Sequence, residues 1–285
     1  YFIGIEKKLT KHHSLGLTAY GAPSRTGRGG VAILEAYELS GNNYYNPNWG
    51  YQNGKVRNAR VNTYHQPRAI LSHYWTIDNN KSLTSSISYS FGRGGSTALN
   101  WYDAADPRPD YYRYLPSYYS EDEYMHQYLT YMWQNDESTR QLDWDSFYHA
   151  NRKNLYTVVN ESGIEGNDVT GNRAKFIVEE RRNDISRWDA SSVYIQDISE
   201  NIRVSAGTNI MRHKTSNFKV ISDLLGADWW LDIDQFAERD FSDNIALQND
   251  VDNPDRIVGV GDKFGYDYLS NINYDLVKYV KDRKG

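Results

Sequence analysis

The clearest pattern in the chain is an alternation of apolar and hydroxyl residues between Asn80 and Gly92. Successive side chains of a β-strand face opposite sides, so this pattern predicts a strand with one apolar face and one hydroxyl face. A soluble sandwich would bury the apolar face, whereas a membrane barrel would turn it to lipid and the hydroxyl face to water. The apolar face carries Leu83, Ile87, Tyr89 and Phe91, and the hydroxyl face carries Thr84, Ser86, Ser88 and Ser90.

Similar alternation recurs along the chain and predicts an all-β, antiparallel protein. Three short polar turns would join strands in pairs, and they lie at Thr10–His13, Asp78–Lys81 and Asp197–Asn201. Longer, polar and aromatic excursions follow the strands at their other ends. Short turns at one end and long loops at the other are typical of an outer-membrane barrel. About seven strands are predicted, over residues 1–9, 14–22, 67–77, 80–92, 176–195, 202–210 and 264–276.

The long excursions are predicted to contain short helices. Residues 31–39 form a helix-like run. Ser120 with Glu123 three residues later resembles a capping box, which predicts a helix from Ser120 to about Asn135 that packs on its own loop. The two Gly-Arg-Gly-Gly tracts, which begin at Gly27 and Gly92, are interpreted as flexible loop entries because they lack the context of a phosphate-binding loop.

Composition narrows the class of protein. The 285 residues carry a formal net charge of −5, which argues against a nucleic acid as partner. No cysteine is present, so disulfides and thiolate metal sites are excluded. No segment reaches the roughly 20 apolar residues of a membrane helix, whereas a barrel strand needs an apolar residue only at every second position. The 25 Tyr and eight Trp residues suit membrane interfaces and ligand contacts.

The loop motifs add a resemblance to the strand pattern. Eight stretches resemble TonB-dependent outer-membrane receptors of the Bacteroidetes type: 15–23, 44–50, 66–92, 104–119, 176–184, 223–241, 248–256 and 261–268. The resemblance implies a barrel of about 22 strands whose lumen is filled by an N-terminal plug. It therefore implies that residues 1–285 are a partial barrel domain, an interior piece that lacks the plug, the remaining strands and a signal peptide.

The resemblance also implies a function: import of a nutrient across the outer membrane, without enzymatic activity or a cofactor. The implied partners are the TonB energy-transducing system, reached through the plug region, a surface lipoprotein or other outer-membrane proteins, and outer-membrane lipid. Two alternatives remain open at this point. One is a barrel subunit that acts as a scaffold in a larger complex, and the other is a soluble surface β-protein that binds or cleaves glycans.

Aromatic residues of the predicted loops are the candidate contacts for a substrate or partner. Loops on a rigid scaffold commonly carry function, and Tyr and Trp offer a large contact area at low entropy cost. The alternative is that these rings only pack the loops together. The candidates are Trp49, Tyr51, Trp101, Tyr111, Tyr112, Trp229 and Trp230.

Other candidate chemistry is weaker. A carboxylate group could bind Ca²⁺ through oxygen ligands, although its spacing fits no EF-hand. It comprises Asp228, Asp232, Asp234, Glu238 and Asp240. The same carboxylates, or Glu179 with Glu180, could be imagined as a glycosidase pair. The seven His residues include no pair at the spacing of a helical metal site, and are interpreted as exposed polar residues.

Overall fold

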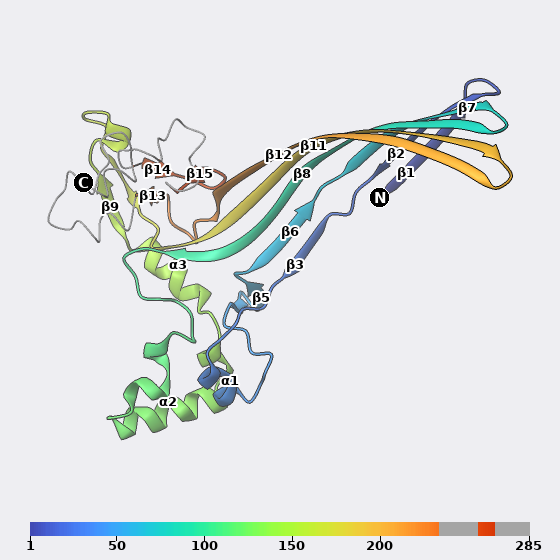
Figure 1. The fold of residues 1–285 in the computed structure, drawn as a ribbon. Helices are drawn as coiled ribbons and strands as arrows, with labels where there is room; N and C mark the ends of the chain where they lie inside the picture. The colour runs from blue at the N-terminus through green and yellow to red at the C-terminus, as the bar shows by residue number, and fades with distance from the viewer. Residues whose placement is uncertain (234–255, 266–285) are drawn as a thin grey trace, which may run out of the picture. The chain divides into compact units, whose positions relative to one another are not determined.

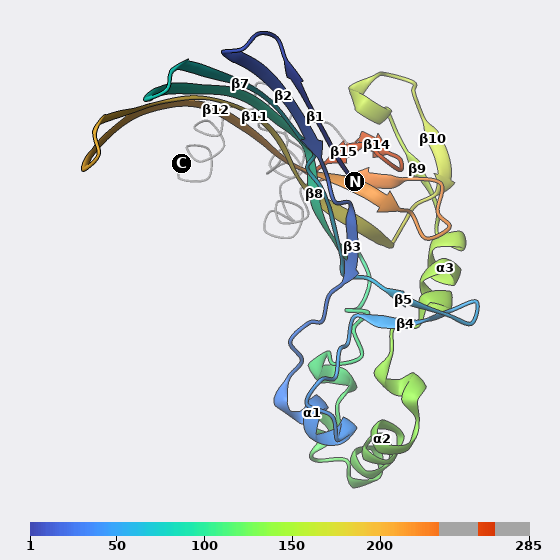
Figure 2. The ribbon, with the colours of Figure 1, turned by 90° about the vertical axis from the view of Figure 1, so that its right-hand side faces the viewer.

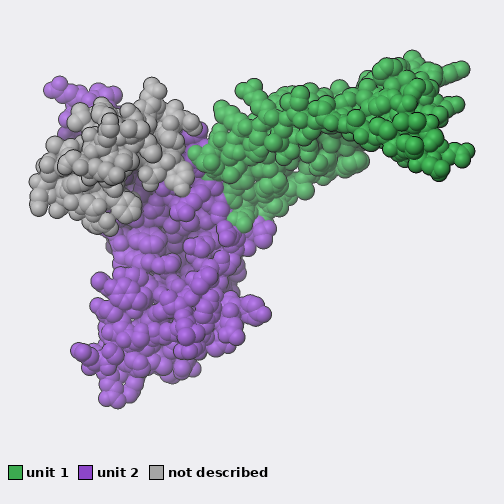
Figure 3. Space-filling view, in the orientation of Figure 1, with its two compact units in different colours: residues 1–25, 62–95, 182–217 green, residues 26–61, 96–181, 218–285 purple. Residues whose placement is uncertain are grey.

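The computed structural model describes residues 1–233 and 256–265. The chain forms two compact units, each assembled from three segments (Figure 3). The strand unit comprises residues 1–25, 62–95 and 182–217. The loop unit comprises residues 26–61, 96–181 and 218–285.

Long strands of one curved sheet build the strand unit (Figures 1 and 2). Their order in the sheet is β1-β2-β7-β8-β11-β12, so each strand lies beside its neighbour in the chain's sequence of long strands. The strands are β1 (Phe2–Lys8), β2 (His13–Tyr20), β7 (Arg68–Asp78), β8 (Lys81–Trp101), β11 (Phe176–Ser199) and β12 (Ile202–Asp223).

These strands confirm the all-β class and six of the seven predicted strands. β8, β11 and β12 are each more than 20 residues long. β8 and β12 run well beyond their predicted ends, and β11 ends four residues after its predicted end, because the alternation weakens before the strand stops. The Gly-Arg-Gly-Gly tract at Gly92 lies inside β8, so its interpretation as a loop entry was wrong. Of the predicted strand over 264–276, Phe264 ends the two-residue β15 (Lys263–Phe264), and residues 266–276 lie outside the described residues.

One face of the sheet carries an exposed row of aliphatic side chains. Ile5 pairs with Leu17, Leu17 with Leu71, and Leu71 with Ile87, so the row crosses β1, β2, β7 and β8. Each of the four side chains is 46–62% exposed. We call Ile5, Leu17, Leu71 and Ile87 the aliphatic row.

The opposite face is polar and internally hydrogen-bonded. Arg68 donates to the Ser88 hydroxyl at 2.7 Å and to the Asp189 carboxylate at 3.0 Å. Ser86 and Ser191 share a hydrogen bond of 2.8 Å between β8 and β11. The predicted separation of an apolar face from a hydroxyl face therefore holds, and the hydroxyls link strands rather than standing alone.

The loop unit has its own short elements and cores. Four buried clusters fill it, and Trp133 and Trp144 are the largest of its fully buried side chains. No described helix is long and apolar enough to cross a membrane. The elements of the loop unit are α1 (Leu34–Ser40), β4 (Trp49–Gln52), β5 (Lys55–Asn58), α2 (Glu123–Asn135), α3 (Trp144–Arg152), β9 (Leu155–Val158), β10 (Val169–Asn172), β13 (Trp230–Asp232) and β14 (Arg256–Val258), with 3₁₀ turns η1 (Tyr112–Tyr114), η2 (Pro116–Tyr119), η3 (Glu137–Arg140) and η4 (Glu161–Gly163). The short strand β3 (Ser24–Gly27) includes residues of both units, and β6 (Val61–His65) belongs to the strand unit from residue 62 onward.

Helix α2 differs from its prediction at its start. Ser120 has helical backbone angles at the end of η2, so it is not the N-cap. Asp122 has an extended backbone and its carboxylate accepts from the Met125 N–H, which makes Asp122 the cap. The buried aromatic residue of α2 is Trp133, while its tyrosines, among them Tyr124, point to solvent. The helix therefore packs on its loop as predicted, through Trp133 and not through these tyrosines.

Gly92 allows β8 to pass close to the end of β6. Its φ of +127° is a conformation that residues with a side chain rarely adopt. A Cβ at this position would lie 2.1 Å from the carbonyl oxygen of His65. The glycine is therefore required both by backbone angle and by space.

We expect Gly92→Ala to destabilise the sheet by about 1–3 kcal/mol, the cost of a strained backbone conformation. The measurement is urea unfolding followed by tryptophan fluorescence. Gly29→Ala is the matched control, because a Cβ there would meet nothing within 4 Å. Equal unfolding midpoints for the two variants would contradict this role of Gly92.

Candidate binding site in the loop unit

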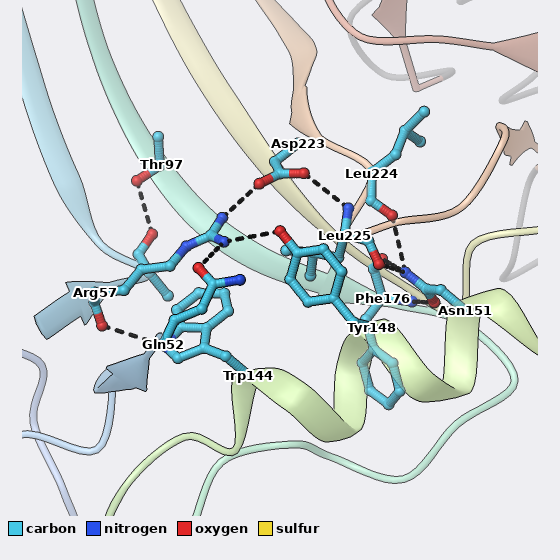
Figure 4. A network of polar contacts seen from close by, with 11 residues as sticks. Gln52, Arg57, Thr97, Trp144, Tyr148, Asn151, Phe176, Asp223, Leu224 and Leu225 are labelled. Carbon is cyan, nitrogen blue, oxygen red and sulfur yellow. Dashed lines mark hydrogen bonds and ion pairs between the residues drawn. The ribbon is translucent and has the colours of Figure 1, made fainter. Parts of the chain in front are cut away.

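A polar network around Arg57 joins three elements of the loop unit (Figure 4). The Arg57 guanidinium donates to Gln52 Oε1 at 2.7 Å, to the Tyr148 hydroxyl at 3.3 Å and to Asp223 Oδ2 at 2.6 Å. It also lies 4.1 Å from the ring centroid of Trp144, and the indole N–H donates back to the Arg57 carbonyl. The hairpin of β4 and β5, helix α3 and the end of β12 are thus fixed to one another.

Asn151 is a second junction, in the last turn of α3. Its side chain is fully buried. Its Nδ2 donates to the backbone carbonyls of Phe176, Leu224 and Leu225, and its Oδ1 accepts from the backbone N–H groups of Lys175 and Phe176 (Figure 4). A buried amide that satisfies this many backbone groups rigidifies the segments that it joins.

A groove of about 170 Å³ opens beside the β4–β5 hairpin. It combines aromatic rings with amide and charged groups, a combination that suits a ligand with both apolar surface and hydrogen-bonding groups. Tyr44 stands at its edge with 93% of its surface exposed, and the half-buried Trp49 meets Tyr51 edge-on at 5.6 Å between centroids. We call this the Trp49 groove; its lining residues are Ser40, Asn42, Tyr44, Tyr45, Asn46, Trp49, Glu137, Arg140 and Gln141.

The floor of the Trp49 groove is rigid. The buried Tyr45 packs edge-on against Trp133 and donates its hydroxyl to the Arg140 carbonyl at 2.9 Å. Burial raises the pKa of Tyr45 far above its usual value. The Gln141 side-chain N–H₂ is buried and has no hydrogen-bond partner. A ligand acceptor that reached it would therefore be favoured.

The wall of the groove is fixed by a close backbone contact. The Leu142 N–H donates to the Trp49 carbonyl at 2.9 Å. A Cβ on the next residue, Gly50, would lie 2.1 Å from the Leu142 carbonyl oxygen, so only glycine fits. The backbone of Trp49 is thus fixed by its contact with the Leu142 backbone.

Asp110 is a buried carboxylate close to Tyr45. It is 5% exposed and its Oδ1 has no hydrogen-bond partner. Burial raises the pKa of Asp110, the nearby Arg108 guanidinium opposes this shift, and Asp106 adds to it. Arg108 is itself paired with Asp106 at 2.7 Å. Ionisation of Asp110 is therefore only partly compensated by its surroundings.

A ladder of tyrosines on and around η1 and η2 is a further exposed aromatic feature of the loop unit. Tyr111 meets Tyr112 edge-on at 4.7 Å, and Tyr112 meets Tyr118 edge-on at 5.5 Å. The Arg113 guanidinium lies 5.5 Å from the Tyr112 ring centroid. Half of the Tyr112 surface is exposed, while Tyr111 is half-buried.

The sequence-predicted aromatic residues separate into three groups. Trp49 with Tyr51, and Tyr111 with Tyr112, form two pairs, each of one half-buried and one exposed ring. Trp101 is half-buried at the end of β8. Trp229 and Trp230 are 5% and 3% exposed and lie in hydrophobic clusters. These last two rings pack the loop unit and are covered from solvent, as the packing alternative expected.

Sequence reasoning missed most of the polar residues of the Trp49 groove. Asn42, Asn46, Arg140 and Gln141 come from two segments almost 100 residues apart, and no local pattern connects them. Tyr44 could have been found, because it lies in a turn-rich, aromatic stretch of the chain.

The carboxylate candidates are engaged in structural contacts. Asp228 Oδ2 accepts from the Asn172 N–H at 2.7 Å, and the buried Asp232 pairs with Arg256 at 2.7 Å. Asp234, Glu238 and Asp240 lie outside the described residues. Among the residues that are described, no group of three or more His, Asp or Glu side chains could hold a metal ion.

Glu179 and Glu180 do not form a carboxylate pair. They are consecutive residues of β11, so their side chains face opposite sides of the strand. Glu179 is 1% exposed and is bound by Asn100 at 3.0 Å and Arg181 at 2.8 Å. Glu179 therefore balances the charge of Arg181 and accepts the hydrogen bond of Asn100.

Comparisons with known proteins give no relative. No family model matches the chain, and no curated protein or solved structure is significantly similar to it.

We expect Asp110→Asn to change the pH dependence of stability. A carboxyl whose pKa is raised in the folded state binds its proton more tightly when the protein is folded. Its ionisation therefore destabilises the fold as the pH rises above 3.8, the pKa of the carboxyl in the unfolded chain. The variant should gain in unfolding free energy relative to the parent as the pH rises from about 4 toward 7. Thermal melts across this range measure the difference.

Asp145→Asn is the control for that measurement, since Asp145 is exposed on α3. The comparison separates the effect of removing a buried carboxyl from that of removing an exposed one. If the gain in unfolding free energy of Asp110→Asn over the parent shrinks as the pH rises, burial does not disfavour the charged form of Asp110.

Proposed function

We propose that the chain forms part of an outer-membrane β-barrel that acts as a TonB-dependent receptor and imports a nutrient. The observation that carries the proposal is the aliphatic row, in which four large side chains in lateral register stay exposed across four strands. Burial of one such side chain stabilises a protein by about 1.5–3 kcal/mol. Contact with lipid would provide a similar free energy to the exposed row, so this face of the sheet would need no protein core.

Aromatic residues border the aliphatic row at both ends. Trp75 pairs with Leu83 near the short turn, and Tyr89 stacks on Trp188 at 4.4 Å and on Phe91 at 5.4 Å toward the other end. The eight residue steps from Leu83 to Phe91 span about 27 Å of strand. Tilted by about 40°, they cover about 20 Å of membrane, close to the apolar band of about 25 Å in such barrels.

The polar face supports an aqueous lumen behind the lipid face. Arg68, Ser88 and Asp189 form a charged, hydrogen-bonded cluster on that side of the sheet. In a barrel this alternation of apolar outside and polar inside is the expected arrangement.

The edges of the sheet favour continuation into a larger barrel. Among the described strands, β1 has no neighbour beyond β2, and β12 pairs onward only through two residues of β15. Unpaired backbone groups are costly in lipid, so a membrane sheet must close. Closure by about 22 strands, a plug in the lumen and coupling to TonB follow from the resemblance in the loop motifs.

The loop unit would then capture cargo, and the Trp49 groove is the aromatic-lined opening that we assign to this role. A second candidate function is a scaffold that docks other outer-membrane or surface proteins. The exposed face of α2 favours it, because Tyr124, Tyr128 and Tyr131 are 48–76% exposed on one helix. Exposed tyrosines of this kind are enriched where proteins meet.

We expect Ile87→Arg to impair barrel assembly by about 2–4 kcal/mol, because it would bring a cation to the lipid face. Thr84→Arg is the matched control on the same strand: its side chain is exposed on the opposite, polar face. Heat-modifiable migration of protein from outer-membrane fractions reports assembly. Equal losses in the two variants would contradict a lipid-facing aliphatic row.

We expect the double variant Tyr44→Ala, Trp49→Ala to lower nutrient uptake several-fold at an unchanged level in the outer membrane, because the groove loses its two accessible rings. Growth on candidate nutrients, followed by uptake of the labelled compound, measures this. Tyr124→Ala with Tyr128→Ala is the control, and inactivation of TonB should abolish uptake in the parent. Uptake that persists without TonB would contradict import driven by TonB. Loss of bound proteins only in the Tyr124→Ala, Tyr128→Ala variant would favour the scaffold.

A further inference from the structure

Two histidines meet side by side on neighbouring strands of the strand unit. His13 is the first residue of β2 and pairs with Trp75 of β7, while His73 lies two positions before Trp75 and pairs with Leu15. His13 and His73 are therefore diagonal neighbours on one face of the sheet. Their spacing of 60 residues in sequence hides the pair from any local motif.

The imidazole rings face each other edge to edge. His13 Nδ1 lies 3.0 Å from His73 Nε2, and the ring planes differ by only 5° with centroids 5.2 Å apart. One of these nitrogens donates and the other accepts, so one lone pair is directed at the partner ring. Trp75 stacks on His13 at 5.4 Å between centroids and fixes its orientation.

We propose that His13 and His73 form a two-histidine binding site for a first-row divalent transition ion such as Cu²⁺ or Zn²⁺. Imidazole is the most common protein ligand of such ions, and neutral rings bind through the unprotonated nitrogen. The ion would bind His13 Nδ1 and His73 Nε2, and solvent would supply its other ligands.

The two rings must turn as well as separate to bind one ion. Two imidazole nitrogens at about 2.0–2.1 Å from a tetrahedral ion are about 3.4 Å apart. The observed 3.0 Å must therefore open by a few tenths of an ångström, while each ring tilts away from the line that joins the nitrogens. The proton of the internal hydrogen bond moves through solvent to the outer nitrogen of its own ring, so both rings stay neutral and no net proton is released.

The surroundings of the pair keep it accessible and well placed. Both rings are half-buried, so neither is sealed from solvent. The paired backbones of β2 and β7 hold the two Cα positions, and rigid strands position metal ligands better than loops. The nearby His12 is engaged elsewhere, because its Nδ1 contacts the Thr76 carbonyl at 3.0 Å. The pair lies on the face of the aliphatic row, at the border that Trp75 marks near the short turn. Under the proposed function it would therefore bind its ion at the membrane–water boundary, where solvent reaches the site.

The test uses the whole protein, purified without a histidine tag, freed of metal by a chelator and titrated with Cu²⁺ alone. We expect one tight site per chain whose electron paramagnetic resonance spectrum shows coupling to two imidazole nitrogens. His13→Gln and His73→Gln should each weaken this site about tenfold or more, since loss of a direct ligand costs at least as much as loss of an outer partner. His213→Gln, a change at an exposed histidine of β12, should leave it unchanged.

Unchanged Cu²⁺ affinity in both His13→Gln and His73→Gln would overturn the proposal. A second measurement needs no variant and so does not depend on how the variants fold. X-ray absorption of the Zn²⁺-loaded parent protein at one equivalent should show two imidazole ligands. A spectrum with one imidazole or with oxygen ligands alone would also overturn it.

Discussion

The backbone register among β1, β2, β7 and β8 decides which side chains of the sheet share a face. A slip of one residue in any of these pairs would move every side chain of that strand to the opposite side. The observed register aligns Ile5, Leu17, Leu71 and Ile87 laterally and leaves the hydroxyl positions together behind them. Contacts such as Arg68 with Asp189 then stabilise that register from the polar side. Both the proposed lipid face and the histidine pair depend on this one alignment.

The fold of the loop unit depends on a different constraint, the hydrogen bonding of its backbone. Long connections carry many backbone polar groups, and these must be satisfied before a loop can hold a defined shape. Here the buried Asn151 satisfies backbone groups of two distant segments, and Arg57 connects a hairpin, a helix and a strand end. Four buried clusters supply the hydrophobic stabilisation. A surface opening such as the Trp49 groove can be preformed because the segments around it are held in this way.

The strands were predictable from the sequence because a period of two is a local signal. The helices were less so: the start of α2 depends on the backbone angles of Ser120 and Asp122, and α3 has too short an amphipathic pattern to stand out. The outcomes for Trp229 and Trp230 depended on contacts with distant residues such as Val158 and Val258. The meeting of His13 with His73 depends on register, which no stretch of sequence records by itself.

Tyrosine shows why composition alone leaves the function of this chain open. Tyr45 is buried in the floor of a groove, Tyr89 lies in an aromatic stack on the sheet, and Tyr124 is exposed on a helix. The same side chain therefore contributes to a core, to a proposed membrane border and to a candidate docking face. Transport and scaffolding require opposite binding properties of such surfaces, because cargo must leave its site whereas a fixed partner stays bound. A groove with rigid walls and few rings suits release, while a broad row of exposed rings suits lasting contact, so the two functions can be separated by where substitutions act.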